Sequence, residues 1–146
     1  MTMPYRFVEN LTVADVAFQA RGKTLDEMFE SAGKAVTAVM VKDLRTIRAQ
    51  ETKQFHLISD QLDLLLFEFL QEIIFYKDAD QLLLRSFALK TAKNENGSYA
   101  LNGTGKGERI DRARHQLLVD VKAVTMHQFK IVQDSRGWEA TVILDI

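Results

Sequence analysis

The sequence contains no cysteine, which excludes disulfide bonds, thiolate nucleophiles and cysteine zinc sites together. Any metal site must therefore use oxygen and imidazole ligands, and only three histidines are present to supply the imidazole. The chain also has no large excess of positive or negative charge, because 19 Lys and Arg against 20 Asp and Glu leave a net charge of -1. Such a balance gives no general attraction to nucleic acid or anionic membranes, so an RNA partner would be contacted locally or indirectly.

Long apolar runs are missing as well. No stretch approaches the ~18 apolar residues that a membrane-spanning helix needs, and the most apolar segment, 62–76, carries Asp63, Glu68 and Glu72. The start Met1 to Arg6 lacks the basic and apolar regions of a secretory signal. We therefore expect a cytoplasmic protein with no membrane association.

Apolar residues nevertheless make up 47% of the 146 residues, including nine Phe, which suffices for one domain spanning residues 1–146 with its own core. Two helices are predicted, at about 24–41 and 60–76. Thr24 and Glu27 form a capping-box pattern at the first, and Ser59-Asp60 opens the second.

The remaining chain has the composition of β-strands. Strands are expected at 5–8, 13–20, 82–91, 98–101, 117–125, 126–132 and near the end of the chain, with an extended segment over 45–58. Asn96-Gly97 predicts a tight hairpin, and Ser135-Arg136-Gly137 predicts the turn before the last strand. The expected fold class is α+β, a single domain in which a mostly antiparallel or mixed β-sheet packs against two amphipathic helices.

The end of the chain, Ile143-Leu144-Asp145-Ile146, is an apolar strand pattern that finishes on a carboxylate beside the terminal carboxylate. If a sheet holds this strand, the two groups are fixed oxygen ligands for a hard cation such as Ca2+ or Mg2+. A chain that happens to end on an acidic residue gives the same pattern, and the residues alone do not separate the two interpretations.

Other polar residues likewise allow both a functional and a structural interpretation. Alternation places Asp15 on the face of its strand away from the main core, which fits either a site or an ordinary polar face. Lys122 on a predicted strand fits a solvated edge residue. Glu68 and Glu72 lie one helical turn apart, as a two-carboxylate site or a solvated stripe would. The Gly103–Gly107 stretch lacks the spacing of a phosphate-binding loop and favours strand bulges.

Along nearly its whole length the chain resembles the archeases, small proteins that assist the GTP-dependent tRNA-splicing RNA ligase. The order and spacing of an Ala-Asp-Val, a Lys-Ala-Val-Thr and a terminal Leu-Asp-Ile piece make the resemblance specific. The matching stretches are Tyr5 to Glu9, Ala14 to Val16, Gly22 to Glu30, Leu64 to Leu70, Gly107-Glu108, Val121 to His127 and Ile143 to Ile146.

The resemblance implies a protein cofactor, not an enzyme: an activator that promotes guanylylation of the ligase and its multiple turnover in tRNA exon ligation. It implies a metal site at Asp15, Asp145 and Ile146, with Ca2+ or another hard divalent cation such as Mg2+ or Mn2+, and an activity-linked lysine at Lys122. Archeases commonly have His three positions before the Asp of Ala-Asp-Val. This chain has Thr12 there, which leaves that position's role in question.

Two rival functions remain compatible with the sequence. One is a general chaperone or an adaptor for RNA-processing proteins, in which the acidic end is a docking surface and metal binding is incidental. The other is a hydrolase that uses the carboxylates for acid-base work, for which the sequence offers no paired nucleophile and base.

Overall fold

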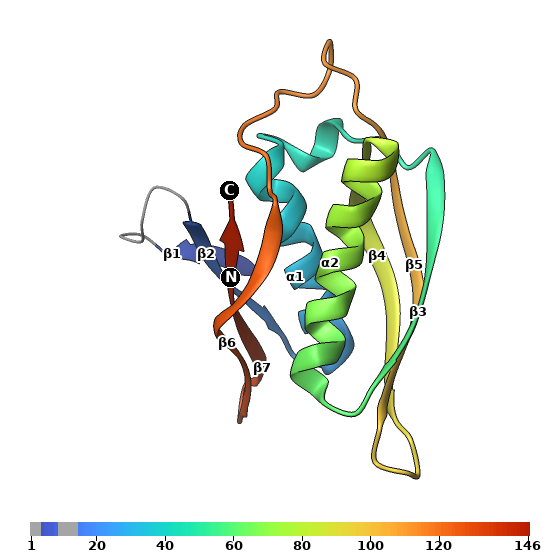
Figure 1. Ribbon diagram of the computed structural model, residues 1–146, viewed down its shortest axis with the longest axis vertical. Helices are drawn as coiled ribbons and strands as arrows, with labels where there is room; N and C mark the ends of the chain where they lie inside the picture. The colour runs from blue at the N-terminus through green and yellow to red at the C-terminus, as the bar shows by residue number, and fades with distance from the viewer. Residues whose placement is uncertain (1–3, 9–14) are drawn as a thin grey trace.

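The computed structural model describes residues 4–8 and 15–146, and within them two helices lie between two antiparallel sheets (Figure 1). One sheet has the strand order β1-β2-β7-β6 and the other β3-β5-β4. In chain order the elements are β1 (Tyr5–Val8), β2 (Asp15–Gly22), α1 (Leu25–Met40), a 3-10 turn η1 (Leu44–Thr46), β3 (Glu51–Ser59), α2 (Leu62–Asp80), β4 (Leu82–Lys93), β5 (Tyr99–Arg109), β6 (Ala123–Asp134) and β7 (Gly137–Asp145).

The helices form the middle layer because each has apolar residues on more than one face. Helix α1 contacts β2 on one side and β4 on the other, and α2 contacts β6 as well as β3 and β4. Within the core, the Phe69 ring of α2 lies 5.0 Å from the Phe55 ring and 5.5 Å from the Phe87 ring. The α+β class and the first helix are confirmed, although the prediction did not divide the strands between two sheets.

Local signals position α1 and the hairpins as predicted. The Thr24 hydroxyl accepts the Glu27 N–H at 3.1 Å and the Glu27 carboxylate accepts the Lys23 N–H at 3.0 Å, which completes the capping box. Strands β4 and β5 pair as the predicted hairpin, but the tight type I′ turn expected at Asn96-Gly97 was wrong: residues 94–98 separate the two strands, and of the two only Gly97 has a positive φ, of 90°. Strands β6 and β7 pair up to Asp134 and Gly137 across the predicted turn.

The predicted end of the second helix at 76 was wrong. Helix α2 continues to Asp80 and stops at Gln81, whose φ of 52° is left-handed. The extra turn is stabilised by Lys77, which is only 7% exposed and donates to Asp120 at 2.6 Å and to the Val121 carbonyl at 2.9 Å. These partners lie more than 40 residues further along the chain, so no local pattern reports them.

The predicted strand over 117–125 was also wrong. Residues 110–122 form a loop, and β6 begins only at Ala123. The apolar alternation over 117–125 suggested a strand, but it does not show which segment lies beside it. In the structure Leu117 forms a β-bridge with Val41, and the Leu118 N–H donates to the Met40 carbonyl at 2.8 Å. The backbone of the loop is thus satisfied by the end of α1, without a neighbouring strand.

The Gly103–Gly107 stretch lies in β5, the central strand of the three-stranded sheet. The rings of Phe55 and Phe87 occupy the space that a side chain at Gly105 would need. A register irregularity does occur here, but it lies in the partner strand β4, between Leu84 and Ser86. The glycines therefore serve close packing across the sheet.

Candidate functional site

Strand register brings together the two acidic residues that the sequence singled out. Asp15 at the start of β2 pairs directly with Asp145 at the end of β7, and Asp145 pairs in turn with Ala123 at the start of β6. Directly opposed residues of an antiparallel pair share one face of the sheet, with Cβ atoms about 4.5–5.5 Å apart. The two carboxylates, 130 positions apart in the 146-residue chain, are therefore neighbours at one end of the four-stranded sheet.

Lys122 joins them through its backbone. Its N–H donates to the Asp145 carbonyl at 2.8 Å, immediately before Ala123 opens β6. The residue is exposed. Figure 1 shows the loop that carries it descending beside the C-terminus into β6. The three predicted residues Asp15, Asp145 and Lys122 thus lie at one place in the fold.

Helix α2 holds this segment from the other side. The Gln71 side chain accepts the Val124 N–H at 2.8 Å, while Lys77 binds Asp120 and the Val121 carbonyl. Burial opposes the charge on Lys77, but its hydrogen bonds to Asp120 and Asp78 outweigh that effect and raise its pKa. Residues on both sides of Lys122 are therefore fixed to one rigid helix.

The donor set at this sheet end suits a hard cation, although it is small. Among residues 4–8 and 15–146, no three His, Cys, Asp or Glu side chains cluster closely enough to hold a metal. A cation at Asp15 and Asp145 would therefore need main-chain oxygens, including that of Ile146, whose side chain packs against the core. Thr12 lies outside the described residues.

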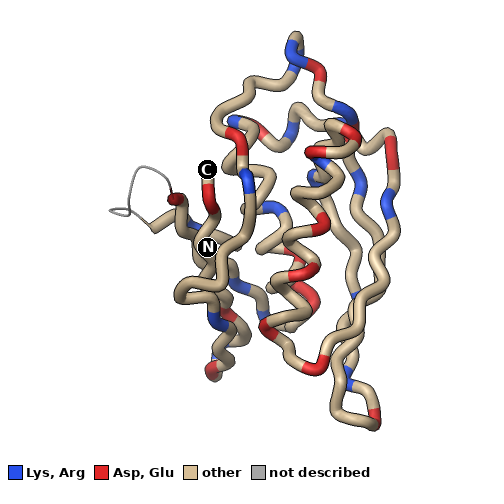
Figure 2. Tube along the Cα trace, viewed as in Figure 1, with Lys and Arg blue, Asp and Glu red and all other residues tan. Residues whose placement is uncertain are grey.

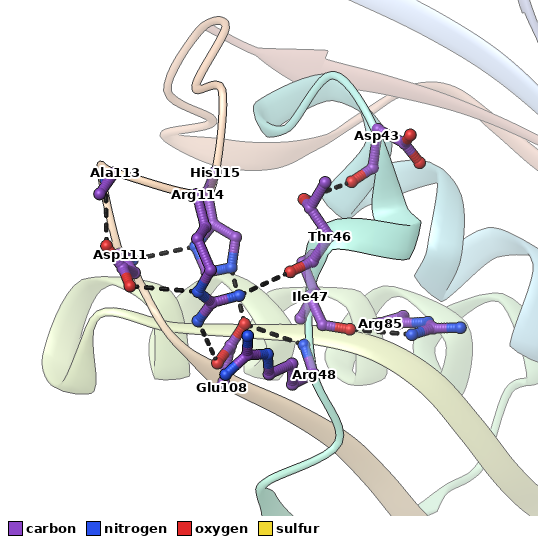
Figure 3. A network of polar contacts seen from close by, with 10 residues as sticks. All are labelled: Asp43, Thr46, Ile47, Arg48, Arg85, Glu108, Asp111, Ala113, Arg114 and His115. Atoms are coloured by element: carbon purple, nitrogen blue, oxygen red, sulfur yellow. Dashed lines mark hydrogen bonds and ion pairs between the residues drawn. The ribbon is translucent and has the colours of Figure 1, made fainter.

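A second polar network holds the loop between β5 and β6 at its beginning (Figure 3). Its centre is Glu108, which is 3% exposed at the end of β5. One carboxylate oxygen accepts the Arg48 N–H at 2.9 Å and the His115 Nε2–H at 2.8 Å, and the other accepts Arg114 at 2.7 Å. His115 Nδ1 accepts the Asp111 N–H at 2.9 Å, so the imidazole must carry its proton on Nε2.

These contacts make the Glu108 carboxyl group strongly acidic. The Arg114 guanidinium is the main cause, followed on the same side by the Arg48 N–H and His115, and together they lower the pKa of Glu108 to about 2 against the opposing effect of burial. Glu108 is thus an anion throughout the physiological range. It anchors one end of the loop whose other end carries Lys122.

The remaining candidates take structural roles or stay apart from this site. Glu68 is exposed, whereas the Glu72 carboxylate accepts the Tyr76 hydroxyl at 3.2 Å and burial raises its pKa. His56, one of the three histidines that could have supplied an imidazole ligand, bonds the Asn102 side chain on the outer surface of β3 and β5. Neither the Glu68–Glu72 pair of α2 nor His56 therefore belongs to the site at Asp15 and Asp145.

Sequence reasoning missed the residues that position the Lys122 segment, namely Gln71, Lys77, Glu108 and His115. One signal was available. Lys77 follows Ile73 and Ile74 at helical spacing, so a lysine occupies the buried stripe of α2. A charged residue there requires a partner, but the partner's identity depends on tertiary structure.

The described residues define a small α+β protein whose sheet end presents two neighbouring carboxylates and a lysine. The archease protein family profile matches residues 5–146. The chain is 32% identical to protein archease of Methanosarcina barkeri over 142 residues, 97% of this chain and 95% of that protein. It is 35% identical to protein archease of Methanothermobacter thermautotrophicus over 133 residues, 91% and 93% of the two chains. The chain therefore belongs to the archease family, as the sequence motifs predicted.

Solved structures agree with this assignment. The solution structure of Methanobacterium thermoautotrophicum protein 1598 matches with a TM-score of 0.85 and 32% identity, over 99% of this chain and 100% of that one. The crystal structure of an archease from Thermotoga maritima, described as a possible chaperone, matches with a TM-score of 0.62 over 97% and 98% of the chains. At 15% identity, the second match shows the fold alone. No helix among the described residues is long and apolar enough to cross a membrane.

Proposed function

We propose that this protein activates the GTP-dependent tRNA-splicing RNA ligase, promoting guanylylation of the ligase and its multiple turnover, without being an enzyme itself. Membership of the archease family supports this proposal. The observation that carries it is the strand register, because it gathers Asp15, Asp145 and Lys122 from separate parts of the chain at one sheet end. RNA is contacted only indirectly in this account, through the ligase.

Electrostatics supports a metal at this end. Like charges directly opposite each other on a sheet are destabilising, and Asp15 faces Asp145 in that position. A hard divalent cation offsets this repulsion and is bound by oxygen ligands. We assign the ligands to the carboxylates of Asp15 and Asp145 with a terminal or main-chain oxygen of Ile146, and the cation to Ca2+, with Mg2+ or Mn2+ as substitutes. When bound, the cation would supply positive charge at the docking surface.

In this account the Lys122 side chain contacts the ligase and does not stabilise the fold. Its main-chain N–H already holds the strand end, so the side chain is left for the partner.

The metal assignment is tested by calorimetric titration of the protein with Ca2+. Asp145→Asn and Asp15→Asn are each expected to weaken binding at least about tenfold, because each removes a charged ligand. Glu68→Gln, which removes an exposed charge from α2, should leave the affinity unchanged and serves as the control. A C-terminal extension should also weaken binding. Wild-type affinity in the extended protein would exclude a terminal carboxylate at Ile146 as a ligand.

The ligase proposal is tested by adding stoichiometric protein to the ligase with GTP and Mn2+ and following guanylylation. Lys122→Gln keeps the main-chain bond to Asp145 and should lose most of the acceleration while circular dichroism stays unchanged. Lys106→Gln, an exposed lysine on β5, should retain the acceleration. If the wild-type protein binds the ligase but never accelerates guanylylation, the general chaperone or adaptor function replaces this one.

A further inference from the structure

A groove of about 300 Å3, called the Leu118 groove below, lies along the segment 117–120. At one end of this segment the Leu118 N–H donates to the Met40 carbonyl at 2.8 Å, and at the other end Asp120 accepts the Lys77 ammonium at 2.6 Å. In Figure 1 the loop that carries the segment is the uppermost part of the chain, above the ends of both helices. Six of the nine residues that line the groove are apolar, namely Met40, Leu83, Ile110, Leu117, Leu118 and Val119.

Two adjacent apolar side chains of this segment remain exposed although their backbone is held in place. Leu118 is 51% exposed and Val119 is 44% exposed. The end of α1 binds the backbone on one side, and Lys77 binds Asp120 and the Val121 carbonyl on the other. Burial of the two side chains against a partner would remove apolar area from water, and an ordered backbone would lose little conformational entropy on binding. The segment therefore has the properties of a preformed contact surface.

The charges beside the Leu118 groove indicate which partner it suits. Asp120 lines the groove, but its carboxylate is bound by Lys77. Arg112 also lines it, is exposed, and within residues 4–8 and 15–146 forms no ion pair with a carboxylate. Lys122, two residues beyond Asp120, is exposed and equally unpaired in the described part of the chain. Figure 2 shows basic positions at the top of this loop and again beside the C-terminus. The charge available to a partner here is therefore positive.

This charge distribution opposes self-association through the groove. In a twofold dimer the same patch of both copies would meet, so Arg112 and Lys122 of one copy would face the same cations of the other. Like charges brought together in an interface disfavour it. A different surface, with apolar side chains and carboxylates at its rim, would bury Leu118 and Val119 and also neutralise Arg112.

We propose that the Leu118 groove docks the RNA ligase through an apolar segment of the ligase that is flanked by acidic residues. This docking role rests on the proposed function and adds a second contact to it. The same loop continues into Lys122, whose N–H donates to the Asp145 carbonyl at 2.8 Å, so docking at the groove would bring the sheet end to the ligase. The groove supplies affinity, whereas Lys122 and the two carboxylates act on the reaction of the ligase.

The test measures binding of the intact protein to the ligase by calorimetry. The double variant Leu118→Ser with Val119→Ser should weaken binding at least about tenfold, because the contact no longer buries two aliphatic side chains. Arg112→Gln should weaken binding severalfold at low salt, and its difference from the wild type should shrink as the salt concentration rises. At saturating concentration the double variant should still reach the wild-type rate of guanylylation, unlike Lys122→Gln.

Matched controls remove the same kinds of group elsewhere on the surface. Ile58→Ser with Phe75→Ser replaces apolar side chains that are 57% and 60% exposed, on β3 and α2. Lys90→Gln removes an exposed cation of β4. Both controls should bind the ligase like the wild type, and urea unfolding checks that every variant is folded.

Three results would overturn the docking role. If the wild type binds and activates the ligase but the double variant binds it equally tightly, or loses no more affinity than its control, the groove is not the contact and the proposed function stands. If the wild type does not bind the ligase, the proposed function and this docking role fail together. If sedimentation shows a dimer of the free protein that the double variant dissociates, the occupant of the groove is a second copy of the chain.

Discussion

Replacing Glu108 by Gln removes the charge at the centre of the network in Figure 3 while keeping nearly the same shape. The wild-type carboxylate accepts Arg114, His115 and the Arg48 N–H. An amide retains one acceptor oxygen, but its NH2 group faces donors in place of the second oxygen. The variant therefore places an NH2 group against the Arg114 guanidinium, on a side chain that is only 3% exposed, and an unmatched polar group at such a buried position is costly.

The magnitude follows from the titration of the carboxyl group. A pKa of about 2 in the folded chain, against the ordinary value of 4.5, corresponds to about 3 kcal/mol of stability at neutral pH. Because the folded-state pKa is lowered, this stability is fully present above pH 4.5 and is lost as the pH falls toward 2. About 1 kcal/mol should remain at about pH 3.

The assay is urea unfolding followed by circular dichroism at about pH 7 and about pH 3. Glu108→Gln should lower the free energy of unfolding by about 3 kcal/mol at the higher pH, equivalent to about 10 °C in melting temperature, and by less than half of that at the lower pH. Glu95→Gln, in the exposed turn between β4 and β5, is the matched control. Equal stability of the two variants at pH 7, or a difference that does not narrow with acid, would refute the reasoning.

Three further changes have defined outcomes. Burial raises the pKa of Glu72, so Glu72→Gln should raise the melting temperature at neutral pH, and the gain should vanish below the ordinary pKa of 4.5. Lys77→Met should cost about 1 kcal/mol in urea unfolding, because Asp120 stays solvated, but should speed hydrogen exchange of the loop before β6 and reduce ligase activation. Gly33→Ala places a Cβ 2.7 Å from the Phe87 ring and should destabilise the domain by about 1–3 kcal/mol; unchanged stability would show that the ring can move.

The elements that the sequence predicted well are those with local causes. The capping box at Thr24 and Glu27 starts α1 where expected, and the turn residues around Gly97 close the predicted hairpin. These signals act within a few residues, so they are readable without tertiary structure. The fold class followed from them together with the apolar content.

The errors arose where distant contacts decide the structure. The true end of α2 depends on Lys77 meeting Asp120, and the loop over 110–122 depends on backbone bonds to the end of α1. The candidate site shows the same limit. The apolar alternation predicted on which face of its strand Asp15 lies, but only the family resemblance connected it with Asp145. The strand register in the structure then places the two residues side by side.

The most direct test of the central proposal measures ligase guanylylation with GTP and Mn2+ at stoichiometric amounts of three proteins. The wild type should accelerate guanylylation and permit repeated turnover, whereas Asp145→Asn and Lys122→Gln, folded and at the same concentration, should give little more than the rate of the ligase alone. A wild-type protein that leaves the rate of guanylylation unchanged would contradict the account, as would full acceleration by both variants.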